Sequence, residues 1–157
     1  MNSSRLEQIF INDPCTSHMF AGFGNPDIIL PKINYFPSFV ILNTDSYLGK
    51  GEHWCVICFT ENKYCYFFDS FGRPPTEYNF ISTLRSMCST IRHNSRAVQG
   101  TLAETCGHHC VYFCMKLCIG WSPDKIIKSY SFSTRKNDNM VFDFVRRKYG
   151  DIAAQIQ

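Results

Sequence analysis

Apolar and polar residues alternate along this chain in two ways, and each way predicts a different kind of element. The segments "SFVILNT" (38–44) and "HWCVICFT" (53–60) are apolar runs rich in aromatic and β-branched residues, which favours buried strands. After the short turn "ENK", the segment "YCYFFDSFG" (64–72) predicts a strand that ends at Asp69 and forms an antiparallel hairpin with the strand before it. A further strand is expected at "SRAVQG" (95–100).

Helical patterns flank these strands. They are expected over five stretches, namely residues 3–12, 73–90, 105–120, 122–130 and 138–150. Ser3 or Ser4 caps the first helix, Gly120 ends the third, and Ser122 caps the fourth. The segment 13–32 contains three prolines and two glycines and is expected to be a loop. This order predicts an α+β fold, with a central, mostly antiparallel sheet flanked by helices in one domain over residues 1–157.

Composition narrows the class of protein. Hydrophobic residues make up 45% and aromatic residues 15% of the chain, which indicates a packed core and an apolar groove. No apolar stretch approaches the ~18 residues that a membrane span needs, and the N-terminal segment lacks the pattern of a signal peptide. The nine cysteines are an odd number, so we expect reduced thiols in a soluble, monomeric, intracellular protein that does not enter a membrane.

The net charge of +3 is only mildly basic. The basic residues gather in three places, namely Arg92 and Arg96, Arg135 and Lys136, and Arg146, Arg147 and Lys148. Solvated helix ends and loops are the simpler interpretation, and a patch that binds a polyanion such as DNA is the alternative.

Two cysteine patterns raise the question of a metal site. In "CVIC", Cys55 and Cys58 have the spacing of a zinc knuckle, but in a strand positions three apart point to opposite faces. Cysteines then recur every four residues from Cys106 through Cys110 and Cys114 to Cys118, which is the spacing of one helical face. Buried cysteine packs as a small hydrophobe, so we expect structural roles for these thiols other than Cys106 and no metal, with a zinc-binding module as the alternative.

Cys106 differs from the other cysteines because it lies where a loop gives way to a helix. A helix N-terminus carries partial positive charge and free N–H groups, and both favour a thiolate. Gly107 removes a side chain next to the sulfur, so a substrate backbone can come close. The pattern predicts a nucleophile, whose backbone N–H can also face a developing oxyanion.

A nucleophilic thiolate needs a base and a group that orients the base. His53 opens one strand of the expected hairpin and Asp69 closes the other, so the two should meet at one edge of the sheet. Gln99, seven residues before Cys106, can supply a second oxyanion donor. His108 and His109 are rival bases, but they follow Cys106 on the same helix and are not easily aimed at its sulfur.

The motifs in this order resemble those of the adenovirus protease family (adenain) and of related proteases in virophages and Polinton-type elements. The matching motifs are "GEHW", "YCYFFDSFG", "VQG" and "CG", and they fall within residues 10–120. The resemblance implies a permuted papain-like cysteine protease fold, with Cys106 as nucleophile, His53 as general base and Asp69 orienting the imidazole. Gln99 and the Cys106 N–H would form the oxyanion hole, and Trp54 would pack beside the histidine.

The resemblance also carries expectations about substrates and cofactors. Members of the family cut viral capsid and core precursors at small, often Gly-containing sites, which implies a polypeptide substrate, in an infected cell's nucleus or cytoplasmic viral factory and in the virion. They are stimulated by a disulfide-tethered peptide and by DNA; Cys88, eleven residues before Gln99, has the offset of the tethering cysteine, although a helix-packing thiol is the plainer interpretation. The chemistry itself requires no metal and no cofactor.

Two rival functions stay open. The wider clan includes the proteases of SUMO and other ubiquitin-like proteins, which use Asp where adenovirus enzymes commonly use Glu, so Asp69 is compatible with an isopeptidase of that kind. The same fold with an inactive site would instead serve as a partner-binding or zinc-binding module.

Overall fold

A five-stranded sheet forms the centre of the computed structural model, which describes residues 1–45, 52–61 and 63–155. Its strands follow chain order: β1 (Phe20–Gly24), β2 (Ser38–Asp45), β3 (Glu52–Glu61), β4 (Tyr64–Phe68) and β5 (Thr90–His93). The inner pairs β2–β3 and β3–β4 are antiparallel, and the edge strands β1 and β5 each pair in parallel. The α+β class is confirmed, and the sheet is mixed, with its antiparallel pairings at the centre.

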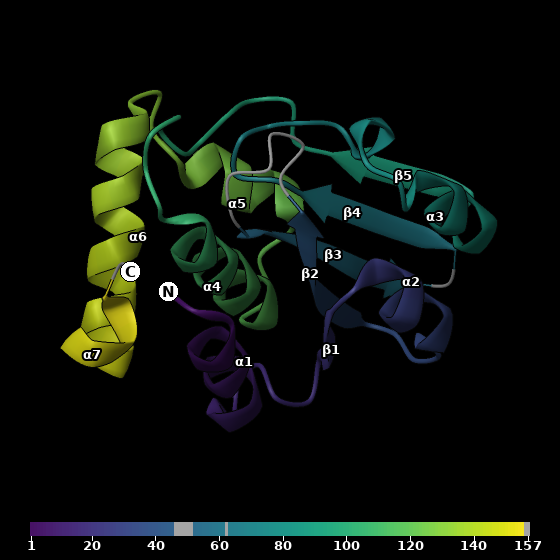
Figure 1. Ribbon diagram of the computed structural model, residues 1–157, viewed down its shortest axis with the longest axis horizontal. Coiled ribbons are helices and arrows are strands. Elements are labelled where there is room, and N and C mark those ends of the chain that lie inside the picture. Colours follow the sequence, from purple (N-terminus) through teal and green to yellow (C-terminus); the bar gives the residue numbers. More distant parts are fainter. Residues whose placement is uncertain (46–51, 62, 156–157) are drawn as a thin grey trace.

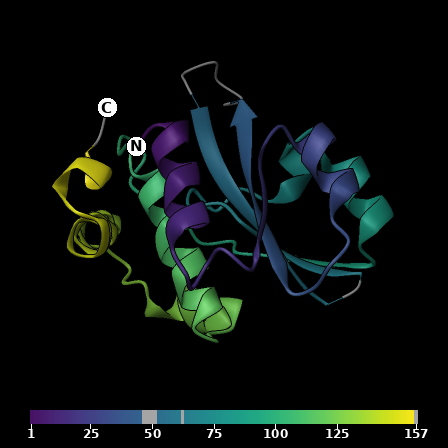
Figure 2. The ribbon, with the colours of Figure 1, turned by 90° about the horizontal axis from the view of Figure 1, so that it is seen from below.

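Helices cover both faces of this sheet (Figures 1 and 2). On one face lie α1 (Ser3–Asn12) and α4 (Cys106–Cys118); on the other lie α2 (Pro26–Ile29), the 3-10 turn Leu30–Lys32 and α3 (Ile81–Met87). The remaining helical elements are the 3-10 turn Pro75–Glu77, α5 (Pro123–Ser129), α6 (Thr134–Tyr149) and α7 (Asp151–Ala154). Within the described part of the chain, no helix is long and apolar enough to cross a membrane.

Aromatic packing fixes α4 on the sheet. The Phe113 ring of α4 stacks on Phe68 of β4 with centroids 4.4 Å apart, and it also stacks on Tyr66 at 6.0 Å. Burying one such side chain contributes about 2–3 kcal/mol, so these contacts hold the helix firmly against β4. As a result, the first residue of α4 has a defined place relative to the end of that strand.

The cysteines of β3 lie on opposite faces of the sheet, as the strand period predicts. Cys58 belongs to the apolar core under α4, whereas Cys55 belongs to the core under α2 and α3. The two sulfurs therefore cannot bind one ion. Cys110 and Cys114 are fully packed within α4, and all nine cysteines are free thiols.

The expected loop at residues 13–32 was wrong, since it contains β1 and α2. β1 is glycine-rich and half-buried, and it pairs only with β2, so its pattern lacks the apolar alternation of a central strand. The first cap was also misassigned: the side chain of Asn2, not of Ser3 or Ser4, accepts the Arg5 N–H at 2.9 Å.

Three other boundaries differ from expectation. Residues 95–100 form no strand, because the N–H groups of Val98 and Gln99 both bond to the Ser70 carbonyl, and β5 lies earlier. The double proline allows only a 3-10 turn, so α3 is much shorter than the expected helix over 73–90. α6 begins earlier than expected, at the residue after its cap Ser133, and α7 rather than α6 is the last helix described.

Candidate active site

His53 and Asp69 meet at one end of the central hairpin. His53 is the second residue of β3, and Asp69 follows the last residue of the antiparallel neighbour β4. The His53 Nε2 and Asp69 Oδ1 atoms are 2.8 Å apart. Both residues are buried, at 5% and 0% exposure, so this hydrogen bond is shielded from water.

Three further residues immobilise Asp69. The Phe71 N–H donates to Asp69 Oδ1 at 2.9 Å, and the Tyr78 hydroxyl donates to Asp69 Oδ2 at 2.6 Å. Asn94 forms two hydrogen bonds with the Asp69 backbone: its Oδ1 accepts the Asp69 N–H at 3.1 Å, and its Nδ2 donates to the Asp69 carbonyl at 2.7 Å. Burial of the carboxyl opposes ionisation, but the hydrogen bonds and the charge of His53 outweigh it and lower the pKa of Asp69.

The electrostatics around His53 favour a charged imidazole. Burial alone would lower the pKa of His53, but neighbouring Cys55, Asp69 and Cys106 outweigh it and raise the pKa. Burial and the nearby Asp69 raise the pKa of Cys55, so this thiol is neutral near pH 7. We therefore attribute the raised pKa of His53 to the Asp69 carboxylate and to the nearby Cys106 side chain.

Cys106 is the first residue of α4, and its side chain lies close enough to the His53 imidazole to raise the pKa of that ring. It is half-buried, whereas Cys110 and Cys114, further along the same helix, are buried. The first N–H groups of a helix have no acceptor within the helix, so they face the space around the sulfur. A thiol, an imidazole and a carboxylate thus lie in sequence at the end of the sheet.

The "DSFG" turn after β4 organises both sides of this site. Asp69 holds His53, while the Ser70 hydroxyl donates to Gln99 Oε1 at 2.5 Å, and the Phe71 ring lies 4.9 Å from that of His53. Gln99 Nε2 donates to the Ala103 carbonyl at 2.7 Å, which leaves one amide hydrogen available.

Gly72 is required at the end of this turn. Its φ of +74° is one that side chains rarely adopt, and a Cβ there would lie 2.7 Å from the Ala97 nitrogen. The close approach brings the segment before Gln99 against the turn that carries Asp69 and Ser70.

Several residues expected near the site have other surroundings. The Trp54 ring lies on the opposite face of β3 from His53 and packs on Phe23, with centroids 4.7 Å apart. The space beside Gly107 is not open, since a Cβ there would lie 3.3 Å from the Met1 Cβ. Cys88 is 5% exposed and lies near Cys65, whose pKa it raises, which is the environment of a packing thiol.

The two adjacent histidines of α4 point away from the sulfur. His108 Nε2 bonds to the Ala154 carbonyl at 2.7 Å, and His109 Nε2 bonds to Asp138 Oδ1 at 2.9 Å. Both rings are fully buried, so neither can exchange protons with a substrate at Cys106.

One group of potential metal ligands occurs among the described residues. His53, Cys55 and Asp69 each offer an atom, and these atoms lie within 4.8 Å of one another. Both oxygens of Asp69 are already hydrogen-bonded, and His53 Nε2 is bonded to one of them. A metal could enter only by replacing the hydrogen bonds that orient the histidine.

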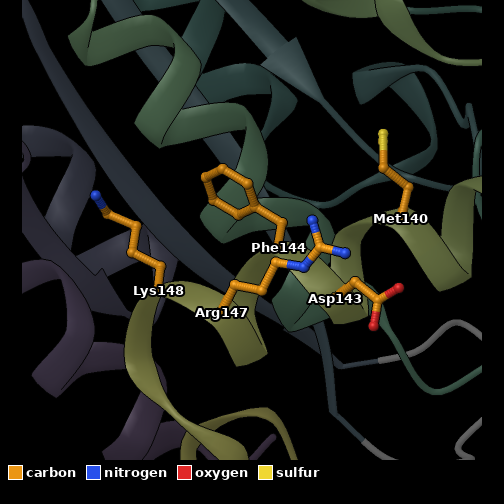
Figure 3. Close-up of a pocket in the computed structure, with 5 residues that line it drawn as sticks. All are labelled: Met140, Asp143, Phe144, Arg147 and Lys148. Carbon is orange, nitrogen blue, oxygen red and sulfur yellow. The ribbon is translucent and has the colours of Figure 1, made fainter.

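Two hollows are relevant to ligand binding. One of about 350 Å³ adjoins the site, since its lining includes Tyr78, which touches Asp69, and Thr44, which pairs with His53. Gly24, Asn25 and Pro26 also line this hollow. Another of about 500 Å³ lies on α6 and shares no residue with the site (Figure 3); its lining is Met140, Asp143, Phe144, Arg147 and Lys148.

The fold and this site define a cysteine peptidase. The family described as adenovirus endoprotease matches residues 18–130, which is most of the chain, so the protein belongs to that family. The chain is also similar to the crystal structure of a protease of ASFV, with a TM-score of 0.58 and 15% sequence identity. That similarity covers 90% of this chain and 66% of the ASFV protease chain, and it supports the fold. No curated protein matches the sequence.

Proposed function

We propose that this protein is an endopeptidase that matures viral structural precursors at small-residue, Gly-containing sites. Cys106 is the nucleophile, His53 the general base, and Asp69 the group that orients it. The observation that carries the proposal is the placement of the Cys106 thiol, at a helix start, near His53, which is hydrogen-bonded to the buried Asp69.

The reaction is an acyl transfer. The Cys106 sulfur, after giving its proton to His53, attacks the peptide carbonyl carbon, and the carbonyl oxygen becomes an oxyanion. When the C–N bond breaks, the leaving amine takes the proton from His53 and a thioester remains. A water molecule that loses its proton to His53 then attacks the thioester. This step releases the carboxylic acid product and regenerates the free Cys106 side chain.

Gln99 and the backbone N–H of Cys106 stabilise the oxyanion. Gln99 is 2% exposed and fixed by Ser70 and Ala103, so its free amide hydrogen has a defined direction. Each such donor contributes on the order of 3 kcal/mol to the transition state. Because the donors are already fixed, little reorganisation is needed during the reaction.

The preference for small residues follows from the family and fits the surroundings of Cys106. Phe71 lies over His53, and the hollow beside the site is lined by the β1–α2 turn and by Tyr78. An extended, glycine-containing peptide is the ligand that we expect to bind beside these residues.

Activation by a peptide or by DNA remains a proposal by resemblance. The buried position of Cys88 beside Cys65 favours the packing role over a tether. The end of α6 offers a DNA contact through Arg146, Arg147 and Lys148, of which Arg146 pairs with Asp143. We propose that the enzyme acts as a monomer within the infected cell and the virion.

An isopeptidase for ubiquitin-like proteins is the second candidate function. The observation that favours it is the carboxylate at position 69, which is Asp, as in the SUMO-protease branch of the clan. Both classes of substrate carry glycine at the cleaved bond, so the site chemistry is shared.

A peptide-library digestion with and without DNA, combined with ubiquitin and SUMO probes, tests the proposal. We expect cleavage after small residues by the parent protein, and loss of at least ~10⁴-fold in the Cys106→Ala variant. The matched control is Cys118→Ala, which removes another half-buried thiol at the far end of α4. Cleavage unchanged in Cys106→Ala would overturn the mechanism, and reaction only with the ubiquitin or SUMO probes would select the isopeptidase.

A further inference from the structure

A second His–Asp pair, with a buried histidine, lies against the segment that joins Gln99 to Cys106. His109 Nε2 and Asp138 Oδ1 are 2.9 Å apart, with the His109 ring fully buried and the Asp138 side chain 14% exposed. His109 is in α4, three residues after Cys106, and Asp138 projects from α6. The reaction proposed above uses neither residue.

The same carboxylate also binds both ends of that segment. The Gly100 N–H donates to Asp138 Oδ2 at 3.0 Å, and the Thr105 hydroxyl donates to Asp138 Oδ1 at 2.8 Å. Gly100 directly follows Gln99, and Thr105 directly precedes Cys106. One side chain on α6 therefore fixes the backbone next to both proposed oxyanion donors.

The sequence around Gln99 fits this arrangement. A Cβ at Gly100 would lie 3.0 Å from Asp138 Oδ2, so a side chain there would press on the carboxylate. The absence of a side chain at Gly100 thus allows the Asp138 carboxylate to approach the backbone, in addition to any role of the glycine in a turn. In the middle of the segment, the Ala103 N–H bonds to the Gly100 carbonyl, the Ala103 carbonyl accepts from Gln99 Nε2, and Leu102 is 96% exposed.

We propose that Asp138 is a positioning residue for the proposed hydrolysis, because it holds the Gln99 amide and the Cys106 N–H at a fixed separation. This inference rests on the proposed function. Asp138 does not touch the reacting atoms; it acts through Gly100, Thr105 and His109. Its loss should loosen the oxyanion hole while leaving the contact between Cys106 and His53 in place.

The test compares Asp138→Ala with Asp143→Ala, which removes a carboxylate from an exposed position of the same helix. The substrate is the peptide that the parent protein cleaves best in the library digestion. We expect Asp138→Ala to lower kcat about 10- to 100-fold with KM changed less than about threefold. The rate of Cys106 alkylation by iodoacetamide, which needs no oxyanion hole, should change less than about threefold.

Two variants test the contacts individually. Asp138→Asn keeps an acceptor for one side of the network but presents an NH₂ group to the other, so kcat should fall between those of the parent and Asp138→Ala. Thr105→Val removes one donor, and its effect should not add to that of Asp138→Ala, because both remove the same contact.

The outcomes separate this inference from the proposed function. A parent protein that cleaves no peptide overturns the function and, with it, this role for Asp138. An active parent with Asp138→Ala within about twofold of it in kcat overturns only the role of Asp138. A parallel fall of kcat and alkylation rate also overturns it, because it would show collapse of the whole site.

Discussion

Two His–Asp pairs, His53–Asp69 and His109–Asp138, differ in the surroundings of the histidine ring. The Nε2–Oδ1 distances are nearly equal, at 2.8 Å for His53–Asp69 and 2.9 Å for His109–Asp138. Burial lowers the pKa of His109, and the carboxylate of Asp138 only partly opposes this. For His53, the neighbouring groups outweigh burial and the pKa is raised.

The difference follows from position. His53 lies at the end of the sheet, where the half-buried Cys106 thiol is near enough to affect its pKa. His109 lies inside the helical layer, where its Nδ1 is 3.3 Å from the Tyr130 hydroxyl. A His–Asp pair beside a nucleophile is suited to moving protons, whereas the same pair inside a core holds the backbone, so the pair alone does not identify an active site.

Asp69→Asn gives the strongest expected contrast between the pairs. An amide at position 69 would favour the wrong tautomer of His53, and kcat should fall about 10⁴-fold. Asp138→Asn should cost far less, since His109 exchanges no proton in the reaction. Steady-state cleavage of the library peptide measures both, and equal losses in the two variants would show that the pairs are not functionally distinct.

Acid unfolding tests the buried histidines of α4 against His53 by their effect on stability. Burial lowers the pKa of His108 to about 4 and also lowers that of His109, so the folded protein binds fewer protons than the unfolded chain below about pH 6.5. Lowering the pH from 7 to 5 should therefore reduce the free energy of unfolding, by about 2 kcal/mol for His108. The stabilisation from the raised pKa of His53 is fully present below about pH 6.5 and adds nothing to this loss.

Urea unfolding at pH 7 and pH 5 measures this slope. His108→Gln keeps a donor for the Ala154 carbonyl but cannot gain a proton, so its stability should depend less on pH. A slope equal to that of the parent protein would mean that His108 does not titrate as its burial implies.

Tyr78→Phe has the smallest expected effect. It removes the hydroxyl that donates to Asp69 Oδ2 at 2.6 Å, but the other contacts of the carboxylate remain. We expect kcat to fall about threefold to tenfold. Tyr149→Phe is the matched control, because it removes a similar 2.7 Å hydrogen bond to Asp13 away from the site. Equal kcat values in these two variants would show that the Tyr78 hydroxyl does not contribute to catalysis.

Local patterns were sufficient to predict the centre of the molecule. Apolar runs and one short turn predict β2, β3 and β4, and the hairpin they form brings His53 to Asp69. The change from loop to helix places Cys106 at the start of α4. These features depend on neighbouring residues in the chain, so a single sequence contains them.

The supporting residues depend on long-range contacts and were missed. Asn94 hydrogen-bonds to the Asp69 backbone although it lies 25 positions later in the chain. Asp138 hydrogen-bonds to Thr105 although it lies 33 positions later. Neither lies in a recognisable motif, and Asn94 directly precedes the segment 95–100 that was predicted to be a strand. β1 was missed because its half-buried, glycine-rich pattern is that of a loop.

The rate at which iodoacetamide modifies each cysteine, followed by mass spectrometry, tests most directly whether Cys106 and His53 act together. At pH 6 we expect Cys106 to react about 100-fold faster than the half-buried Cys15 and Cys118. That advantage should disappear in His53→Ala and persist in His109→Gln. Equal rates at the three cysteines, or a Cys106 rate unaffected by His53→Ala, would contradict the account.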